Sequence, residues 1–324
     1  MRTPFAHLSL ALVLGTLLAA PAQAERDHFE PMRMLANSGM GNTALHSATS
    51  SKPLTVLAAL PVTFGLGQLL LQGTEVKLER AAPANLPGSR QTAYFTGRGA
   101  PALAKQAQEA DAVIGLRSIW ADDPLYPNAR RSNIRIIEID AARPVDGALP
   151  GVALQPGQSD GLSAQPWQSS NNLGRMADVL AADLGRLAPE AKPQIDSNLA
   201  NLKQRLLKLS ADSEARLAEA DNLSVLSLSE HFGYLVSGLN LELVAVDARA
   251  DNEWTADALQ QLQARLKEQD VAIVLHHRQP SDALKAAISA GGSQLLVLQT
   301  DGADPLSELQ GNLQQVTQAL APKS

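Results

Sequence analysis

The segment LSVLSLSEHFGYL, residues 223–235, indicates the fold class of the whole chain. Its first half is an apolar run that predicts a strand from Leu223 to Leu228, and a helix is predicted from His231 to Leu239. Ser229 stands between the two elements. In an open α/β sheet, ligands bind where polar side chains leave the carboxyl end of a strand. The segment therefore predicts a binding edge on a parallel sheet.

The same alternation of strand and helix continues on both sides of this segment. Toward the C-terminus the pattern predicts strands at Leu241–Val246, Ala272–Leu275 and Gln294–Leu298, with helices at Thr255–Gln269, Ser281–Ala290 and Leu306–Leu320. Toward the N-terminus it predicts strands at Leu54–Leu60, Glu75–Leu78, Ala112–Leu116 and Ile134–Ile139, helices at Pro61–Leu71 and Pro101–Ala110, and a loop over Pro83–Gly99. Such alternation is typical of parallel strands joined by right-handed crossovers.

Two long helical patterns without an intervening strand separate these halves. They run from Asn171 to Leu187 and from Pro193 to Ala218, and their apolar residues recur three or four positions apart. We expect an α/β fold of two α/β lobes with mainly parallel sheets and a ligand cleft between the lobes. The predicted boundaries are residues 53–168 for the N-terminal lobe, 169–190 for the linking helix and 191–322 for the C-terminal lobe.

The N-terminus predicts export from the cytoplasm. Residues 1–24 combine the basic Arg2, an apolar run from Leu8 to Ala20 and a cleavage site with small residues that ends at Ala24. This layout is typical of a cleavable signal peptide. Residues 25–52 have no steady period and predict a flexible arm. Because no later run reaches about eighteen apolar residues, we do not expect the mature chain to span a membrane.

Composition narrows the possible partners. The chain has no cysteine, which excludes thiolate chemistry and cysteine metal sites, and this fits the bacterial periplasm as the location. The formal net charge of -6 becomes about -7 once Arg2 leaves with the signal. This net negative charge argues against nucleic acid and against an anionic membrane as the main partner.

The chain resembles the TroA-like, or zinc and manganese type, periplasmic binding proteins of ABC importers from Pro53 to Leu320. The motifs that carry the resemblance are the strand and helix at 54–73, the run Glu109–Val113, Trp167 followed by 171–184, and Phe232–Leu235. The resemblance implies two lobes joined by a long rigid linking helix and docking to a permease in the inner membrane. The chain also looks similar to the second periplasmic binding protein that accompanies pyoverdine-iron import systems.

Members of that family generally hold their metal with three histidines and one carboxylate. Carried over residue by residue, these positions fall on Arg90 or Gln91, Gln165, Ser229, His276 or His277, and Asp301, which matches the late aspartate of the family. A tight zinc or manganese site needs about three or four converging ligands. Only one of the family's ligand positions is clearly kept in this sequence, so this departure from the family pattern predicts that a bare divalent ion does not occupy the usual pocket.

Two interpretations of the histidines stay open. His231, His276 and His277 could converge with Asp301 on a shifted metal site for Zn, Mn or Fe, because the loops after these strands share one rim. The other interpretation is that His231 caps a helix or packs beside Tyr234. Strand alternation then allows only one residue of the pair His276 and His277 to point into the cleft.

Arginines and aromatic residues lie in loops that the family places around the cleft. The candidate ligand-binding residues are Arg90, Tyr94, Arg98, Arg117, Trp120, Gln165, Trp167, Ser229 and His231. Guanidinium groups bind carboxylate or catecholate oxygens and stack on rings, so this set favours an anionic or planar guest such as a chelated metal. Alternatively, these arginines form a solvated face.

We therefore predict a periplasmic solute-binding protein of an ABC importer whose cargo is a metal chelate, most concretely iron as a siderophore complex. One alternative is a divalent-metal binder with the shifted ligand set. Another is a partner without cargo that serves as a scaffold for a second periplasmic binding protein. We do not expect an enzyme, because the sequence has no Gly-x-Ser-x-Gly elbow, phosphate-binding Gly-rich loop or His-Glu-x-x-His motif.

Overall fold

The computed structural model describes residues 52–147, 149–155 and 161–322. The predicted signal peptide, residues 1–24, lies outside this range. The predicted arm, residues 25–52, also lies outside it except for Lys52.

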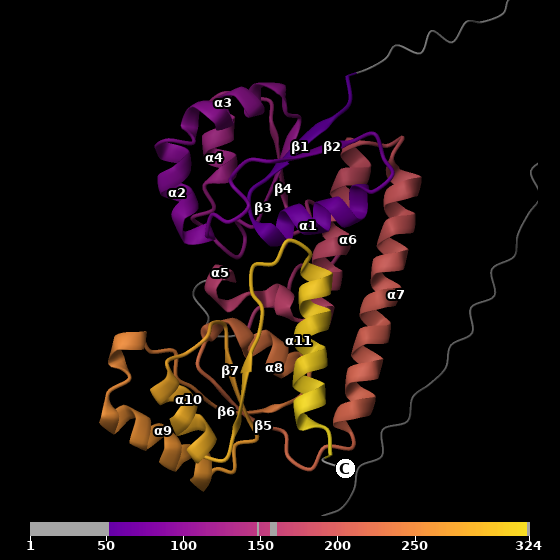
Figure 1. The fold of residues 1–324 in the computed structure, drawn as a ribbon. Helices are drawn as coiled ribbons and strands as arrows, with labels where there is room; N and C mark the ends of the chain where they lie inside the picture. The colour runs from indigo at the N-terminus through magenta and orange to yellow at the C-terminus, as the bar shows by residue number, and fades with distance from the viewer. Residues whose placement is uncertain (1–51, 148, 156–160, 323–324) are drawn as a thin grey trace, which may run out of the picture. The chain divides into compact units, whose positions relative to one another are not determined.

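Two parallel sheets form the framework of the described chain (Figure 1). The N-terminal sheet has the order β2-β1-β3-β4 and consists of β1 (Thr55–Ala58), β2 (Lys77–Arg80), β3 (Ala112–Gly115) and β4 (Ile137–Asp140). The C-terminal sheet has the order β6-β5-β7-β8 and consists of β5 (Ser224–Ser227), β6 (Glu242–Val246), β7 (Ile273–His276) and β8 (Gln294–Val297). The two halves share one strand order, and the prediction of two α/β lobes with parallel sheets is confirmed.

Burial explains why the central strands are easy to recognise in the sequence. All four residues are buried in each of β1, β3, β5 and β7, which lie inside their sheets. Strands covered by helices on both faces carry continuous rather than alternating apolar residues. The edge strands β2, β4, β6 and β8 keep exposed or half-buried positions, and their sequences are correspondingly mixed.

Helices cover both sheets and connect them. The N-terminal lobe contains α1 (Pro61–Leu71), α2 (Gly88–Thr96), α3 (Ala100–Glu109) and α4 (Leu125–Arg130). The connection contains α5 (Gly161–Ala164), the 3-10 turn η1 (Pro166–Gln168), α6 (Ser170–Leu187) and α7 (Lys192–Leu217). The C-terminal lobe contains η2 (Glu230–Phe232), α8 (Gly233–Gly238), η3 (Asp251–Glu253), α9 (Ala256–Glu268), α10 (Asp282–Ala290) and α11 (Pro305–Leu320).

The helix α2 corrects the predicted loop over Pro83–Gly99. Within this helix only Gln91 and Phe95, one turn apart, are buried. A helix that buries a single apolar side chain shows no apolar period, so the pattern resembled a loop rich in Pro and Gly.

The long helix α7 contacts helices of both lobes. Its Asn198 Nδ2 donates hydrogen bonds of 2.8 Å to the carbonyl oxygens of Leu70 and Gln72 at the end of α1. The same helix packs along α6 and against the C-terminal helix α11 (Figure 1). We therefore propose that α6 and α7 together form the link, in place of residues 169–190 alone.

One hydrophobic cluster runs from sheet to sheet through the connecting helices. It contains Val56 and Leu66 of the N-terminal lobe, Met176 of α6, and Leu275 and Leu309 of the C-terminal lobe. Two smaller clusters lie on the other faces of the sheets. Interiors packed in this way resist deformation, so a shared core favours a stiff connection between the lobes. Among the described residues, no helix has the length and apolar character needed to cross a membrane.

Candidate functional site

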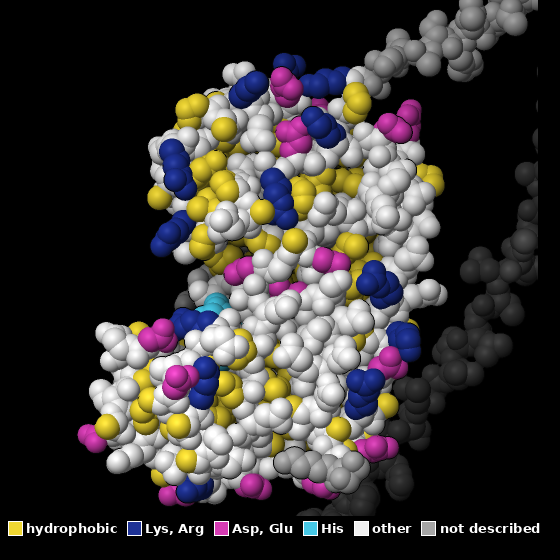
Figure 2. Space-filling model, viewed as in Figure 1, with side chains coloured by type: hydrophobic (Ala, Val, Ile, Leu, Met, Phe, Trp, Pro, Cys, Tyr) yellow, Lys and Arg dark blue, Asp and Glu magenta, His cyan; other side chains and the backbone are white. Residues whose placement is uncertain are grey.

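The carboxyl ends of the strands in each sheet lie next to segments of the other half or of the connection. Gly161 N at the start of α5 donates to Ile119 O after β3, over 2.9 Å. His231 after β5 has its Nδ1 atom 2.5 Å from the carbonyl oxygen of Ser163 in α5. Figure 2 shows an indentation between the two lobes with histidine atoms at its edge. The loops after the strands therefore form the candidate site.

Three histidines from two of these loops form a cluster. His231 lies in η2 after β5, His276 ends β7, and His277 follows it. The ring centroid of His277 is 4.8 Å from that of His231 and 5.0 Å from that of His276. The structure places the three rings close together, and whether they bind a metal remains a prediction.

Hydrogen bonds define the roles of the ring nitrogens in this cluster. A carbonyl oxygen can only accept, so His231 Nδ1 is the donor to Ser163. His276 Nδ1 accepts from the backbone N–H of His277 over 3.0 Å. His277 Nε2 lies 3.1 Å from a guanidinium nitrogen of Arg278, which can only donate. The rings of His276 and His277, each of which accepts a hydrogen bond on one nitrogen, are therefore assigned as neutral.

The electrostatics of the cluster agree with this assignment. Burial lowers the pKa of His277 to about 4, and the charges of His231, His276 and Arg278 act in the same direction. Burial also lowers the pKa of His276. Loss of hydration raises the pKa of the surface residue Asp301, and the charge of His231 opposes this rise. Among the described residues, no group of three or more His, Asp and Glu side chains is arranged to hold a metal ion.

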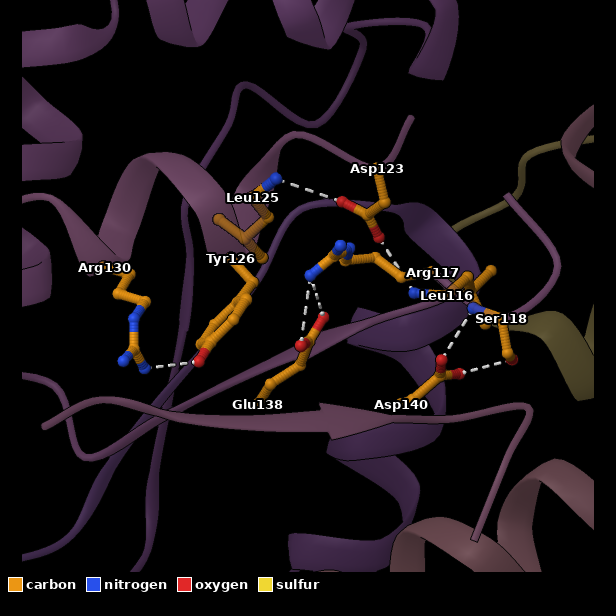
Figure 3. Close-up of polar contacts among 9 residues, drawn as sticks. All are labelled: Leu116, Arg117, Ser118, Asp123, Leu125, Tyr126, Arg130, Glu138 and Asp140. Carbon is orange, nitrogen blue, oxygen red and sulfur yellow. Dashed lines mark hydrogen bonds and ion pairs between the residues drawn. The ribbon is translucent and has the colours of Figure 1, made fainter. Parts of the chain in front are cut away.

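A network of carboxylates lies at the ends of β3 and β4 (Figure 3). Asp123 is buried and accepts from the backbone N–H groups of Leu116 and Leu125, over 2.8 and 3.0 Å. Asp140 accepts from the backbone and hydroxyl groups of Ser118, over 2.7 and 2.9 Å. Burial raises the pKa of Asp123 despite its two donors.

The predicted guest-binding residue Arg117 belongs to this network. Its Nη1 atom lies 3.3 Å from Glu138 Oε2 on β4, and both side chains are partly exposed (Figure 3). Burial raises the pKa of Glu138, and the charge of Arg117 lowers it. In this structure the positive charge of Arg117 is therefore already balanced within the protein.

The candidates Arg90, Tyr94 and Arg98 lie on α2 or directly after it. Arg90 is exposed on the first turn of α2. Tyr94 lies about 6 Å further along the helix axis, a distance that follows from the rise per residue. Tyr94 packs on Phe95 with ring centroids 5.4 Å apart, and the guanidinium carbon of Arg98 lies 5.6 Å from the Tyr94 ring. The structure thus pairs Tyr94 with Arg98, and Arg90 lies one turn before Tyr94 on the same helix.

The two tryptophan candidates contribute to packing. Trp167 in η1 is 4% exposed and belongs to the main core. Trp120 is half-buried and packs against the same core. Trp120 therefore retains some surface for a guest, whereas packing accounts for nearly all of Trp167.

Three positions that the family resemblance assigns to metal ligands carry buried side chains with internal partners. Gln91 is fully buried, and its Nε2 atom donates to Ala59 O after β1 over 3.2 Å. Gln165 Oε1 accepts from Gln168 Nε2 over 3.4 Å. Ser229 Oγ accepts from His231 N over 3.3 Å and caps η2.

Some buried polar atoms nevertheless lack a partner within the described part of the chain. They are Arg80 Nη1, Gln91 Oε1, Asp183 Oδ2 and His277 Nδ1. Arg80 ends β2, His277 follows β7 and Gln91 contacts the end of β1, so all three lie at carboxyl ends of strands. Arg80 was not among the residues selected from the sequence. Its position two residues after the predicted strand Glu75–Leu78 was the available signal.

Comparisons with known proteins agree with this architecture. The family model described as ZnuA, zinc-uptake complex component A, periplasmic, matches residues 100–321. The solved structure of the SBP FpvC from P. aeruginosa in complex with Ni²⁺ has a TM-score of 0.61 at 22% identity, covering 83% of this chain and 97% of that chain.

Two further solved structures are similar. A crystal structure of ZnuA has a TM-score of 0.62 at 20% identity, covering 83% of this chain and 100% of that chain. The metal-dependent lipoprotein YcdH from Bacillus subtilis has a TM-score of 0.66 at 17% identity, covering 82% of this chain and 99% of that chain. At these identities the likeness shows the fold alone. No curated protein sequence matches the chain.

Proposed function

The chain belongs to the ZnuA family, the periplasmic, non-enzymatic binding components of ABC importers, and we propose that its own cargo is a metal chelate rather than a bare divalent ion. A ferric siderophore is the concrete form of this proposal. We infer that an ABC permease in the inner membrane receives the cargo. A second periplasmic binding protein is a further expected partner.

This proposal is supported by the side chains at three expected ligand positions, because they form hydrogen bonds within the protein. Gln91, Gln165 and Ser229 are buried and bond to groups of the protein itself. A tight zinc or manganese site needs about three or four ligands converging at about 2 Å. A chelate brings its own metal ligands, so the protein has to bind only the organic surface of the complex.

The clustering of His231, His276 and His277 supports a second candidate function. Their ring centroids lie 4.8 and 5.0 Å from the His277 centroid. This candidate would combine nitrogens of the three rings with Asp301, whose carboxylate is influenced by the charge of His231, as ligands for Zn²⁺, Mn²⁺ or Fe²⁺. Ligand rotation and the loss of the His231 contact with Ser163 oppose this arrangement.

Native mass spectrometry of protein recovered from the periplasm of its own host tests the main proposal. We expect a bound guest of several hundred daltons that contains iron. A lone metal ion would favour the second candidate. An empty protein that co-purifies with another periplasmic binding protein would favour a scaffold without cargo.

Isothermal titration with Zn²⁺, Mn²⁺ and Fe²⁺ provides an independent test. The chelate proposal predicts no submicromolar binding of these ions. Submicromolar binding that His276→Ala or His277→Ala abolishes would contradict it. A variant at the exposed residue Asp122, Asp122→Ala, serves as the matched control, because it removes one potential ligand outside the cluster.

A further inference from the structure

Arg80 occupies an unusual position for a charged side chain. It is the last residue of β2, and its register partner is Ala58 at the end of the buried strand β1. Its guanidinium carbon lies 3.8 Å from the centroid of the Phe64 ring in α1. This cation–π contact holds the guanidinium at the edge of the sheet where the loops of the candidate site begin.

The positive charge of Arg80 has no counter-charge in the described part of the chain. Its Nη1 atom is buried and has no hydrogen-bond partner there. Burial lowers the pKa of Arg80, and no neighbouring carboxylate raises it. Other arginines contact carboxylates directly, namely Arg117 with Glu138, Arg186 with Asp183, Arg249 with Asp247 and Arg278 with Asp251.

A partly buried charge without a partner is unfavourable, because its lost hydration is not replaced. Such groups in native proteins usually have a bound water, an ion or a ligand as the missing partner. A guanidinium offers several N–H donors in one plane, which matches carboxylate and other planar oxyanion groups. It repels a bare metal cation.

We propose that Arg80 is the residue of the N-terminal lobe that binds an anionic oxygen group of the cargo, such as a carboxylate or a catecholate. The inference rests on the proposed function and specifies the chemical class of the cargo as an anionic metal chelate. The Phe64 ring orients the guanidinium, and the organic shell of the chelate supplies the acceptor. Arg117 does not serve this role, because Glu138 already balances its charge.

The test uses iron chelates from the iron-starved culture medium of the host, separated on an anion-exchange resin into a retained, anionic fraction and an unretained fraction. Binding of each fraction is followed by tryptophan fluorescence for the wild-type protein, Arg80→Met and Arg80→Lys. The matched control is Arg131→Met, because Arg131 is exposed and lies before β4, at the opposite end of the same sheet.

We expect the wild-type protein and Arg131→Met to bind the anionic fraction equally. Arg80→Met should bind it at least about tenfold more weakly, as expected for the loss of a hydrogen bond between charged groups. Arg80→Lys should recover only part of the affinity, because an ammonium lacks the planar fork.

Each other outcome overturns a defined part of the argument. Unchanged binding by Arg80→Met contradicts the role of Arg80 and leaves the chelate proposal intact. Wild-type binding of the unretained fraction alone contradicts the anionic class and again leaves the chelate proposal intact. If the wild-type protein binds neither fraction, the proposed function fails and this inference fails with it.

Thermal unfolding distinguishes a binding role from a structural one. Arg80→Met removes both the unfavourable unpaired charge and the cation–π contact with Phe64, and the methionine can still pack on the ring, so the Tm of the protein without cargo should change little. A lowered Tm together with weaker binding would show that Arg80 supports the structure, and this result would overturn the proposal.

Discussion

Gln168 Nε2 donates a hydrogen bond to Glu308 Oε1, and this contact joins η1 in the connection to the first turn of α11. Both side chains are buried. Gln168 Oε1 accepts in turn from Asn312 Nδ2 over 3.1 Å, and Glu308 Oε2 accepts from the backbone N–H of Gly302. A buried network of this kind ties the connection to the C-terminal lobe with directional contacts.

Replacing the donor of this pair should destabilise the protein in a pH-dependent way. Burial already raises the pKa of Glu308, and the hydrogen bond from Gln168 lowers it. Gln168→Leu removes that donor, so the free energy of unfolding should fall by about 1–3 kcal/mol at pH 7. A carboxyl whose folded pKa is raised stabilises the fold at low pH and loses that contribution as the pH rises.

The loss for Gln168→Leu should therefore be larger at pH 8 than at pH 5, as measured by urea unfolding at both values. Gln310→Leu, at an exposed position of α11, is the control and should change stability little. A loss that is equal at both pH values would contradict the role assigned to Glu308.

Asn198 should prove important for the attachment of α7 to the N-terminal lobe. Its Nδ2 atom donates to the carbonyl oxygens of Leu70 and Gln72, over 2.8 Å each. Asn198→Ala leaves these helix-end carbonyls without that donor and should lower the free energy of unfolding by about 1–2 kcal/mol. Urea unfolding measures this loss. Asn201→Ala, exposed on the same helix, should lose under about 0.5 kcal/mol, and equal losses would refute the prediction.

Gly65 should not tolerate a side chain. A Cβ atom at this position of α1 would lie 2.5 Å from Ala303 O and would also collide with the ring of Pro305, at the start of α11. Gly65→Ala therefore forces α1 away from this segment and should lower the free energy of unfolding by about 1–3 kcal/mol.

Gly174 in α6 provides the matched comparison for Gly65. Its Cβ would meet Leu206 Cδ1 at 3.6 Å, which is an ordinary contact. Gly174→Ala should retain or raise stability by up to about 1 kcal/mol, because alanine favours the helix. The two variants are compared by thermal unfolding, and a stable Gly65→Ala protein would show that α1 does not pack closely there.

The histidine cluster should make the metal-free protein sensitive to acid. Burial lowers the pKa of His277 from 6.5 to about 4. A base whose folded pKa is lowered stabilises the fold above its unfolded pKa, and this contribution is lost as the pH falls toward the folded value. The urea midpoint of the wild-type protein should therefore fall between pH 6.5 and 4 in the presence of EDTA.

His277→Gln removes the titrating ring. The side-chain amide oxygen of the glutamine can still accept a hydrogen bond from Arg278. The fall of its urea midpoint over the same pH range should be smaller than that of the wild-type protein. An identical pH profile for the two proteins would exclude His277 as the source of the acid sensitivity.

Local sequence patterns were sufficient for the secondary structure wherever burial was continuous. The buried strands β1, β3, β5 and β7 appear as apolar runs, and long helices such as α6 show a clear period. The helix α2 was missed because Phe95 is its single buried apolar residue. The predicted linking helix ended at residue 190. It therefore did not include Asn198, whose side chain donates hydrogen bonds to the end of α1.

The candidate site was predictable only in part. The proximity of His231, His276 and His277 was one of two interpretations left open by the sequence, because loops after neighbouring parallel strands meet at one edge of a sheet. The ion pair of Arg117 with Glu138 and the stacking of Arg80 on Phe64 were not predictable, because each depends on side chains brought together from separate elements.

The sequence by itself determined the two α/β lobes and the loops that face each other, because apolar periodicity and chain order set strands and their polarity. Only the tertiary structure decided which charges are balanced and which are not. That distinction depends on the distance and hydration of groups far apart in the chain, and it separates Arg117, paired with Glu138, from Arg80, whose buried Nη1 atom lacks a partner among the described residues.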